Sequence, residues 1–202
     1  MKKNIIIAAV IFLNLILLMV LIYVGVTWSP SGKASADATG AAQDKSAEGG
    51  PEEFTFKAPG RFVGDEAPPV VNRALTITAT FDALEQGGVI VAQGGLAHGY
   101  ALYVQDGELF FVLRRLNVLT TISGGKVGAG RQTATAMLTR AGELSVAFDG
   151  KAPATGKAAG VITMQPIDGL DIGADRGAPV GIYEVPNSFG GTIEVVSVKT
   201  AP

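Results

Sequence analysis

The stretch NRALTITATFDALEQGGVIVAQGGLAHGYALYVQDGELFFVLRR, residues 72–115, decides the fold. Its first part, Ala74–Phe81, alternates between apolar and polar side chains without a break. The apolar positions are Leu75, Ile77, Ala79 and Phe81, and threonines stand between them. Because side chains alternate across a strand, this pattern predicts a β-strand with one buried face. Val89-Ile90-Val91, between two glycine pairs, predicts a short buried strand.

A β-hairpin is predicted next, with its turn at Asp106-Gly107. Asp-Gly between two apolar runs favours a type I′ turn, in which both central residues adopt positive φ. A two-residue turn fixes the register, so that Gln105 faces Glu108 and Tyr103 faces Phe110. One face then carries core side chains: Tyr100, Leu102, Val104, Leu109, Phe111 and Leu113. The other face carries Ala101, Tyr103, Phe110 and Val112, a set too apolar for full exposure to water.

The rest of residues 54–202 continues the β pattern. Phe54–Phe56 predicts the first strand, Leu116–Ile122 a strand after the hairpin, and Thr192–Lys199 the last strand. Asp149-Gly150 predicts a second two-residue turn, with Lys151–Ala154 pairing back on the strand before it. Many short strands at regular spacing indicate an antiparallel jelly-roll β-sandwich, an all-β domain over residues 54–202. We expect the last strand to pair near the first.

Five segments together carry a family resemblance: NRALTITATF, GGVIVAQGG, GYALYVQDGELFFVLRR, QPIDGLDIGADRGAPVGIY and FGGTIEVVSV. In order and spacing they resemble the C-terminal domain of many bacterial arylsulfatases, a sandwich of the concanavalin A-like, laminin G-like class. The resemblance covers roughly residues 61–199. It implies an accessory domain of a separate catalytic domain, which this chain lacks.

The N-terminus predicts a membrane anchor over residues 1–28. Its apolar run, Ile5–Val26, would span roughly 33 Å as a helix, enough for the hydrocarbon core of a bilayer. Lys2 and Lys3 favour a cytoplasmic N-terminus, which places the rest of the chain in the periplasm or at the cell surface. A cleaved signal peptide is the alternative, with Ala34-Ser35-Ala36 as its cleavage site. Residues 29–53, rich in small and polar residues, predict a flexible linker.

Composition and motifs argue against several functions. The net charge of −2 gives no electrostatic case for nucleic acid, and the absence of cysteine excludes disulfides and cysteine-ligated zinc. The sole histidine, His98, lies in a glycine-rich turn without a Gly-x-Ser-x-Gly elbow elsewhere. The chain also lacks the Glu-x-Asp-x-x-Glu run of glycosidases with this fold and the Cys/Ser-x-Pro-x-Arg motif of sulfatases. We therefore predict that the protein is not an enzyme.

Candidate binding residues lie on the outer hairpin face and in the late loop. Tyr103 and Phe110 would stack on a sugar ring, unless a loop covers them. Residues 59–71, with three prolines, are predicted to form an extended loop and are one candidate for such a cover. Arg114, Arg115 and Arg176 would clamp an anionic group such as a sulfate; solvated edge charge is the alternative. Any ligand is expected near Tyr103, Phe110, Arg114 and the Asp175-Arg176 loop. Asp171 and Asp175, with Asp168 nearby, are candidate calcium ligands, although ordinary turn aspartates explain them equally simply. No other cofactor is predicted.

These observations predict a membrane-tethered, extracytoplasmic, non-catalytic binding module for a glycan or a partner protein. The alternative is a structural or assembly subunit that docks onto a separate envelope enzyme, such as a sulfatase without this domain. The sequence itself does not choose between the two.

Overall fold

A computed structural model describes residues 50–202, which form fourteen strands and one turn of 3-10 helix, η1 (Gly64–Glu66). The predicted anchor and the linker up to residue 49 lie outside the described residues. Within residues 50–202, no helix has the length and hydrophobicity needed to cross a membrane.

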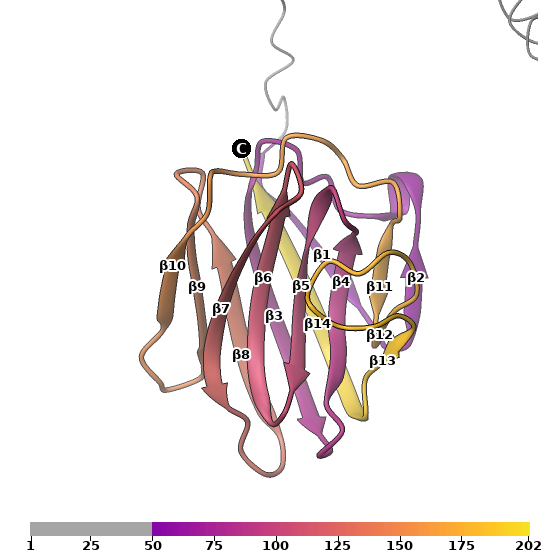
Figure 1. The fold of residues 1–202 in the computed structure, drawn as a ribbon, viewed down its shortest axis with the longest axis vertical. Helices are drawn as coiled ribbons and strands as arrows, with labels where there is room; N and C mark the ends of the chain where they lie inside the picture. Colours follow the sequence, from indigo (N-terminus) through magenta and orange to yellow (C-terminus); the bar gives the residue numbers. More distant parts are fainter. Residues whose placement is uncertain (1–49) are drawn as a thin grey trace, which may run out of the picture. The chain divides into compact units, whose positions relative to one another are not determined.

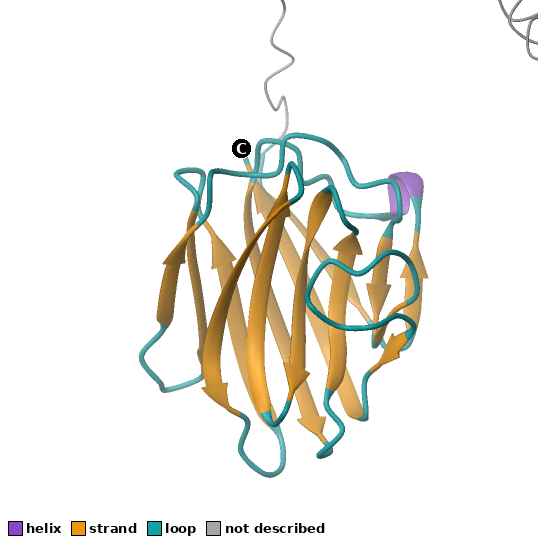
Figure 2. Cartoon of the chain, in the orientation of Figure 1, coloured by secondary structure: helices purple, strands orange, loops and turns teal. Residues whose placement is uncertain are grey.

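The strands form two six-stranded antiparallel sheets that face each other (Figures 1 and 2). The first sheet has the order β1 (Glu52–Phe56), β14 (Gly191–Ala201), β3 (Ala74–Ala83), β8 (Gln132–Leu138), β9 (Glu143–Phe148), β10 (Ala154–Lys157). The second has the order β2 (Gly60–Phe62), β11 (Leu170–Ile172), β4 (Gly88–Gly94), β5 (His98–Gln105), β6 (Glu108–Arg115), β7 (Val118–Lys126). A small third sheet pairs β12 (Ala174–Asp175) with β13 (Asn187–Ser188). The predicted β-sandwich is thus confirmed.

The central hairpin, β5–β6, has the predicted register. Gln105 pairs with Glu108 and Tyr103 with Phe110, and Asp106 adopts a positive φ of 51° in the turn. The six side chains predicted to face the core are all buried between the sheets, as are the four apolar positions of β3. The first and last strands also pair as predicted, because β1 lies along β14; β1 begins at Glu52, two residues before the predicted start.

Three local predictions are wrong. The predicted turn at Asp149-Gly150 forms, since the Lys151 amide donates to the Phe148 carbonyl at 3.0 Å, but β10 pairs with β9 only from Ala154, opposite Val146, and not from Lys151. Leu116 does not open a strand, since Leu116 and Asn117 form the turn between β6 and β7 with φ of 50° and 64°. Residues 59–71 are not one extended loop, because they contain β2 and η1.

The strands run between two rims of the sandwich. β1 begins at the rim where β14, β4 and β6 end, drawn at the top of Figure 1; we call this the N-terminal rim. β4 begins and β5 ends at the opposite end, the far rim. Residues 176–186, between β12 and β13, curl over the outer face of β4 and β5; we call them the cover loop (Figure 1).

Candidate functional site

The outer face of the hairpin carries a cluster of three aromatic rings. Tyr103 stacks against Phe110 with ring centroids 5.4 Å apart and an interplanar angle of 23°. Tyr183 of the cover loop meets the Tyr103 ring edge-on, with centroids 4.9 Å apart. Tyr103 is only 4% exposed as a result. Of the two alternatives for this face, the structure has the covered one, and the covering segment is the cover loop, with Val180 and Tyr183 in the cluster, rather than residues 59–71.

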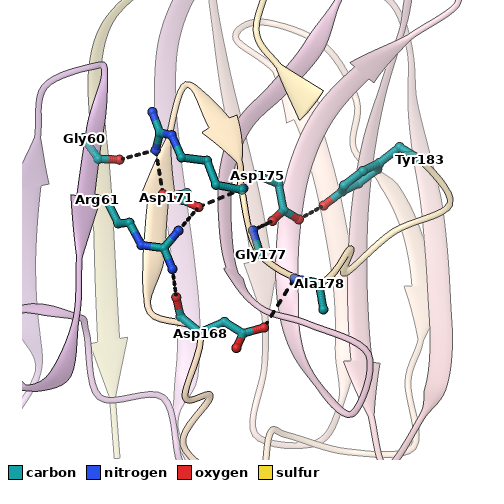
Figure 3. Close-up of polar contacts among 9 residues, drawn as sticks. Gly60, Arg61, Asp168, Asp171, Asp175, Gly177, Ala178 and Tyr183 are labelled. Carbon is teal, nitrogen blue, oxygen red and sulfur yellow. Dashed lines mark hydrogen bonds and ion pairs between the residues drawn. The ribbon is translucent and has the colours of Figure 1, made fainter. Parts of the chain in front are cut away.

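A carboxylate fastens the cover loop in this position (Figure 3). Asp175 accepts hydrogen bonds from the Tyr183 hydroxyl at 2.8 Å and from the Gly177 amide at 3.2 Å. Burial raises the pKa of Asp175, an effect that these two hydrogen bonds oppose in part. Burial and the neighbouring Asp175 carboxylate raise the pKa of the Tyr183 hydroxyl, so Tyr183 remains a donor at neutral pH. The predicted residues Tyr103, Phe110 and Asp175 are therefore linked through Tyr183.

Because its pKa is raised, Asp175 should make stability depend on pH. The folded protein holds the Asp175 proton more tightly than the unfolded chain, so its contribution to the free energy of unfolding falls as pH rises above the ordinary aspartate value of about 3.9. Asp175→Asn should flatten this decline, since an amide oxygen still accepts from Tyr183. Urea unfolding between about pH 4 and 7 measures it. Asp106→Asn, in an exposed turn that suits asparagine, is the matched control and should keep the wild-type slope.

A second carboxylate, Asp171, holds two arginines at the edge formed by β2 and β11 (Figure 3). Its oxygens lie 2.7 Å from the Arg176 guanidinium and 3.5 Å from that of Arg61, and Arg176 also donates its backbone amide to it at 3.0 Å. Asp171 is buried, whereas both guanidinium groups are partly exposed. Arg176 therefore joins Asp171 and not the aromatic cluster.

The predicted calcium ligands have other partners in this structure, and calcium binding by them stays a prediction. Asp171 is already neutralised by two guanidinium groups, and Asp175 is occupied by hydrogen-bond donors. Calcium takes six to eight oxygen ligands. Within residues 50–202, no group of three or more acidic, histidine or cysteine side chains is placed to hold a metal. Asp168 instead accepts a long hydrogen bond, 3.5 Å, from the amide of Ala178.

Arg114 lies apart from the aromatic pair. It is on the same face of β6 as Phe110 but four residues further along, about 13 Å at the usual rise of a strand. Its Nε donates to the carbonyl of Val180 in the cover loop at 2.8 Å. The structure thus gathers Tyr103, Phe110 and Asp175 around Tyr183. Arg114 lies beside the cover loop, away from the aromatic pair, and Arg176 is the first residue of the loop. Ligand binding by these five residues stays a prediction.

An open hollow of about 390 Å³ adjoins the aromatic cluster at the far rim; we call it the far-rim hollow. It is lined by Gln86, Gly88, Tyr103, Val104, Gln105, Tyr183, Glu184, Pro186, Asn187 and Ser188. The lining residues thus include three with a side-chain amide, two tyrosines and one glutamate. None of the lining residues is lysine or arginine.

Sequence reasoning missed most of this hollow. Gln105 was detectable, since the hairpin register places it beside the turn and two residues from Tyr103. Asn187 gave no signal, because β13 has only two residues and shows no periodicity, and Tyr183 lies in the irregular cover loop. Only the folded cover loop brings them beside the β5 end.

A second hollow, of about 250 Å³, lies at the N-terminal rim beneath the turn between β4 and β5. His98 lines it, is 5% exposed, and has no hydrogen-bond partner for Nδ1 within the described residues. The lining is otherwise mostly apolar and includes Leu96, Met164 and Ile167. Nothing in this arrangement orients His98 through Nδ1, as a catalytic carboxylate would.

No protein-family model matches the sequence, and no curated protein matches it. Several solved structures share the fold. The CBM40 domain of the Ruminococcus gnavus IT-sialidase, solved bound to α2,3-sialyllactose, is 16% identical, with a TM-score of 0.53 over 73% of this chain and 88% of that domain.

Domains LG4–5 of the mouse laminin α1 chain are 17% identical, with a TM-score of 0.53 over 74% of this chain and 42% of that one. The Streptococcus pneumoniae NanB sialidase is 13% identical, with a TM-score of 0.51 over 72% and 26%. The chain therefore spans less than half of these two proteins. The resemblance to the C-terminal domain of arylsulfatases stays a prediction. The likeness to the CBM40 and laminin structures shows that residues 50–202 share their all-β sandwich fold.

Proposed function

We propose that this protein is a non-catalytic, membrane-tethered module that binds a neutral oligosaccharide in the far-rim hollow. The observation that carries the proposal is the lining of that hollow. Tyr103 and Tyr183 form one wall, and the amides of Gln86, Gln105 and Asn187 line the space beside them. Amide groups both donate and accept hydrogen bonds, as sugar hydroxyls do, and the apolar edges of the phenols suit the faces of a sugar ring.

The charge of the hollow favours an uncharged sugar. Glu184 is the only ionisable side chain in the lining besides the two tyrosines, and it would repel a sulfate or carboxylate. The arginines predicted to select an anion are engaged elsewhere: Arg176 with Asp171, and Arg114 with the Val180 carbonyl. At this position we therefore expect a neutral ligand, and not the sulfated one that the sequence predicts.

The likeness to the CBM40 domain supports a sugar as the class of ligand, because that domain was solved with a sialylated oligosaccharide. The ligand of that domain carries a negative charge, whereas the far-rim hollow is lined by no lysine or arginine. We therefore take the class of ligand from the likeness and its charge from this chain's own residues.

The position of the hollow suits a tethered module. β1, which follows the predicted linker, begins at the N-terminal rim, and the hollow lies at the far rim. A chain anchored through residues 5–26 would thus present its binding site on the side away from its attachment. This arrangement supports recognition of a glycan that lies outside the membrane.

Replacing Gln105 with alanine should weaken the binding of a neutral oligosaccharide about five-fold, since one hydrogen bond contributes about 1 kcal/mol. Gln105 is exposed beside a turn, so the fold should be unaffected. Calorimetry with neutral and sulfated oligosaccharides measures the effect, and wild-type dissociation constants should lie between roughly millimolar and micromolar. Gln132→Ala, on β8 and outside the hollow, is the matched control.

Two other outcomes would redirect the proposal. If Arg114→Ala abolishes binding of a sulfated oligosaccharide while Gln105→Ala changes nothing, the ligand lies beside Arg114, as the sequence predicts. If no oligosaccharide binds and an envelope enzyme co-purifies with the full chain, the assembly-subunit hypothesis is the better one.

A further inference from the structure

Exposed apolar side chains gather at the N-terminal rim. Within residues 50–202, nine large hydrophobic residues are exposed, and six of them lie at this rim, in loops or at the start of a strand: Val63, Leu96, Leu116, Val118, Met164 and Ile167. Ile167 is 95% exposed, which leaves almost its whole side chain in water. A gathering of this kind on one end of a soluble domain indicates an interaction surface.

The turns that carry these residues lie next to one another. The amide of Asn117, in the turn between β6 and β7, donates to the carbonyl of Ala97, in the turn between β4 and β5, at 3.0 Å. Residues 164–168 line the same 250 Å³ hollow as Leu96. The three segments, residues 94–98, 116–118 and 163–168, therefore form one continuous surface, which we call the apolar rim patch.

The start of β1 and the predicted anchor before it indicate which surface this patch faces. β1 begins at the same rim, at Glu52, and the sequence predicts a bilayer-spanning run over residues 5–26. The intervening residues 29–51 would have an average end-to-end distance of only about 25 Å as a flexible linker. The bilayer that holds the predicted anchor is therefore within reach of the patch, at a high effective concentration.

The low charge of the apolar rim patch argues against electrostatic binding to lipid headgroups. Asp168 and His98 are the only ionisable residues in the three segments of the patch, and neither lysine nor arginine occurs there. Binding to anionic headgroups relies on clusters of lysine and arginine, which are absent from these segments. Insertion of apolar side chains into the interface is the mode that fits.

We propose that the apolar rim patch docks on the lipid surface that holds the chain's anchor, with Ile167, Leu116 and Met164 inserted at the interface. Docking would hold the sandwich upright, with the far-rim hollow turned away from the membrane. This inference rests on the predicted anchor, but it does not depend on whether a sugar is the ligand.

The test uses the full chain in phosphatidylcholine nanodiscs. The chain has no cysteine, so Ile167→Cys and Leu84→Cys each give one site for a fluorescent label. Leu84 is the matched control, since it is 62% exposed and lies at the far rim. With brominated lipid, the label at position 167 should lose about half of its fluorescence and that at position 84 less than about a tenth. Raising the salt concentration should leave the result unchanged.

A second variant tests the patch rather than one residue. A triple variant adds Leu116→Asn and Met164→Asn to Ile167→Cys. Because it removes apolar area from the patch, the quenching at position 167 should fall about two-fold. Asparagine suits the positive φ of residue 116, so the turn should persist.

The contrary outcomes are distinct. Equal quenching at positions 167 and 84, with the chain still in the nanodisc, overturns the docking and leaves the anchor intact. Failure of the chain to enter the nanodisc overturns the anchor and the docking together, while sugar binding remains separately measurable. Protection of position 167 from aqueous iodide without quenching by brominated lipid assigns the patch to a second copy of the chain.

Discussion

Phe111→Ala is expected to lower the free energy of unfolding by about 3–5 kcal/mol, and Leu102→Ala by about 2–5 kcal/mol. Both side chains are 0% exposed and lie opposite each other on the core face of the central hairpin. Their removal leaves a cavity between two sheets that cannot close without moving the strands. Urea unfolding of residues 44–202 or of the full chain measures the loss.

Thr78→Ala is the matched control for the core variants. Thr78 lies on the outer face of β3, is half-buried, and has its hydroxyl 3.5 Å from that of Thr135. Its replacement should cost no more than about 0.5–1 kcal/mol. A Leu102→Ala midpoint no lower than that of Thr78→Ala would contradict the assignment of the two faces.

Gly88→Ala is expected to destabilise the fold by about 2–4 kcal/mol and to disrupt the far-rim hollow at the same time. Gly88 has a φ of 113°, which side chains rarely adopt, and a Cβ there would lie 2.2 Å from the carbonyl oxygen of Ser188. That oxygen belongs to β13, which lines the hollow with Asn187. The variant should therefore lower the urea midpoint and weaken sugar binding by more than Gln105→Ala.

Gly107→Ala separates the effect of backbone strain from that of the steric clash. Gly107 also has a positive φ, 72°, but a Cβ there would meet no atom within 4 Å. Its cost should be only the intrinsic one of a left-handed residue, about 1–2 kcal/mol, and sugar binding should be unchanged. If the two glycine variants lose equal stability and affinity, contact between Gly88 and β13 does not hold the hollow together.

The hairpin could be predicted because its signals are local. The Asp106-Gly107 turn fixes which residues pair, and the alternation of side chains then assigns each one to a face. The turn at Leu116-Asn117 escaped the same reasoning, because leucine at a positive φ is rare and gives no signal for a turn. The pairing of β6 with β7 on either side of the turn holds Leu116 and Asn117 in this conformation.

The cover loop could not be predicted, because distant residues hold it. The Val180 carbonyl accepts a hydrogen bond from Arg114, 66 positions earlier in the sequence, and the Tyr183 ring packs against Tyr103. No period or spacing in residues 176–186 indicates these partners. The sequence did identify Tyr103 and Phe110 as an outer pair too apolar for full exposure to water. It could not identify the cover loop as the segment that packs on them.

The place of β1 in its sheet has a mechanical consequence. β1 is an edge strand, joined to β14 by five residue pairs, and it begins at the rim opposite the hollow. A pull on Glu52, with a sugar held at the far rim, acts along the strand and therefore at right angles to its interstrand hydrogen bonds. The five pairs are then sheared together instead of being opened one after another. Under such tension, a weakly bound sugar is expected to dissociate before β1 separates from β14.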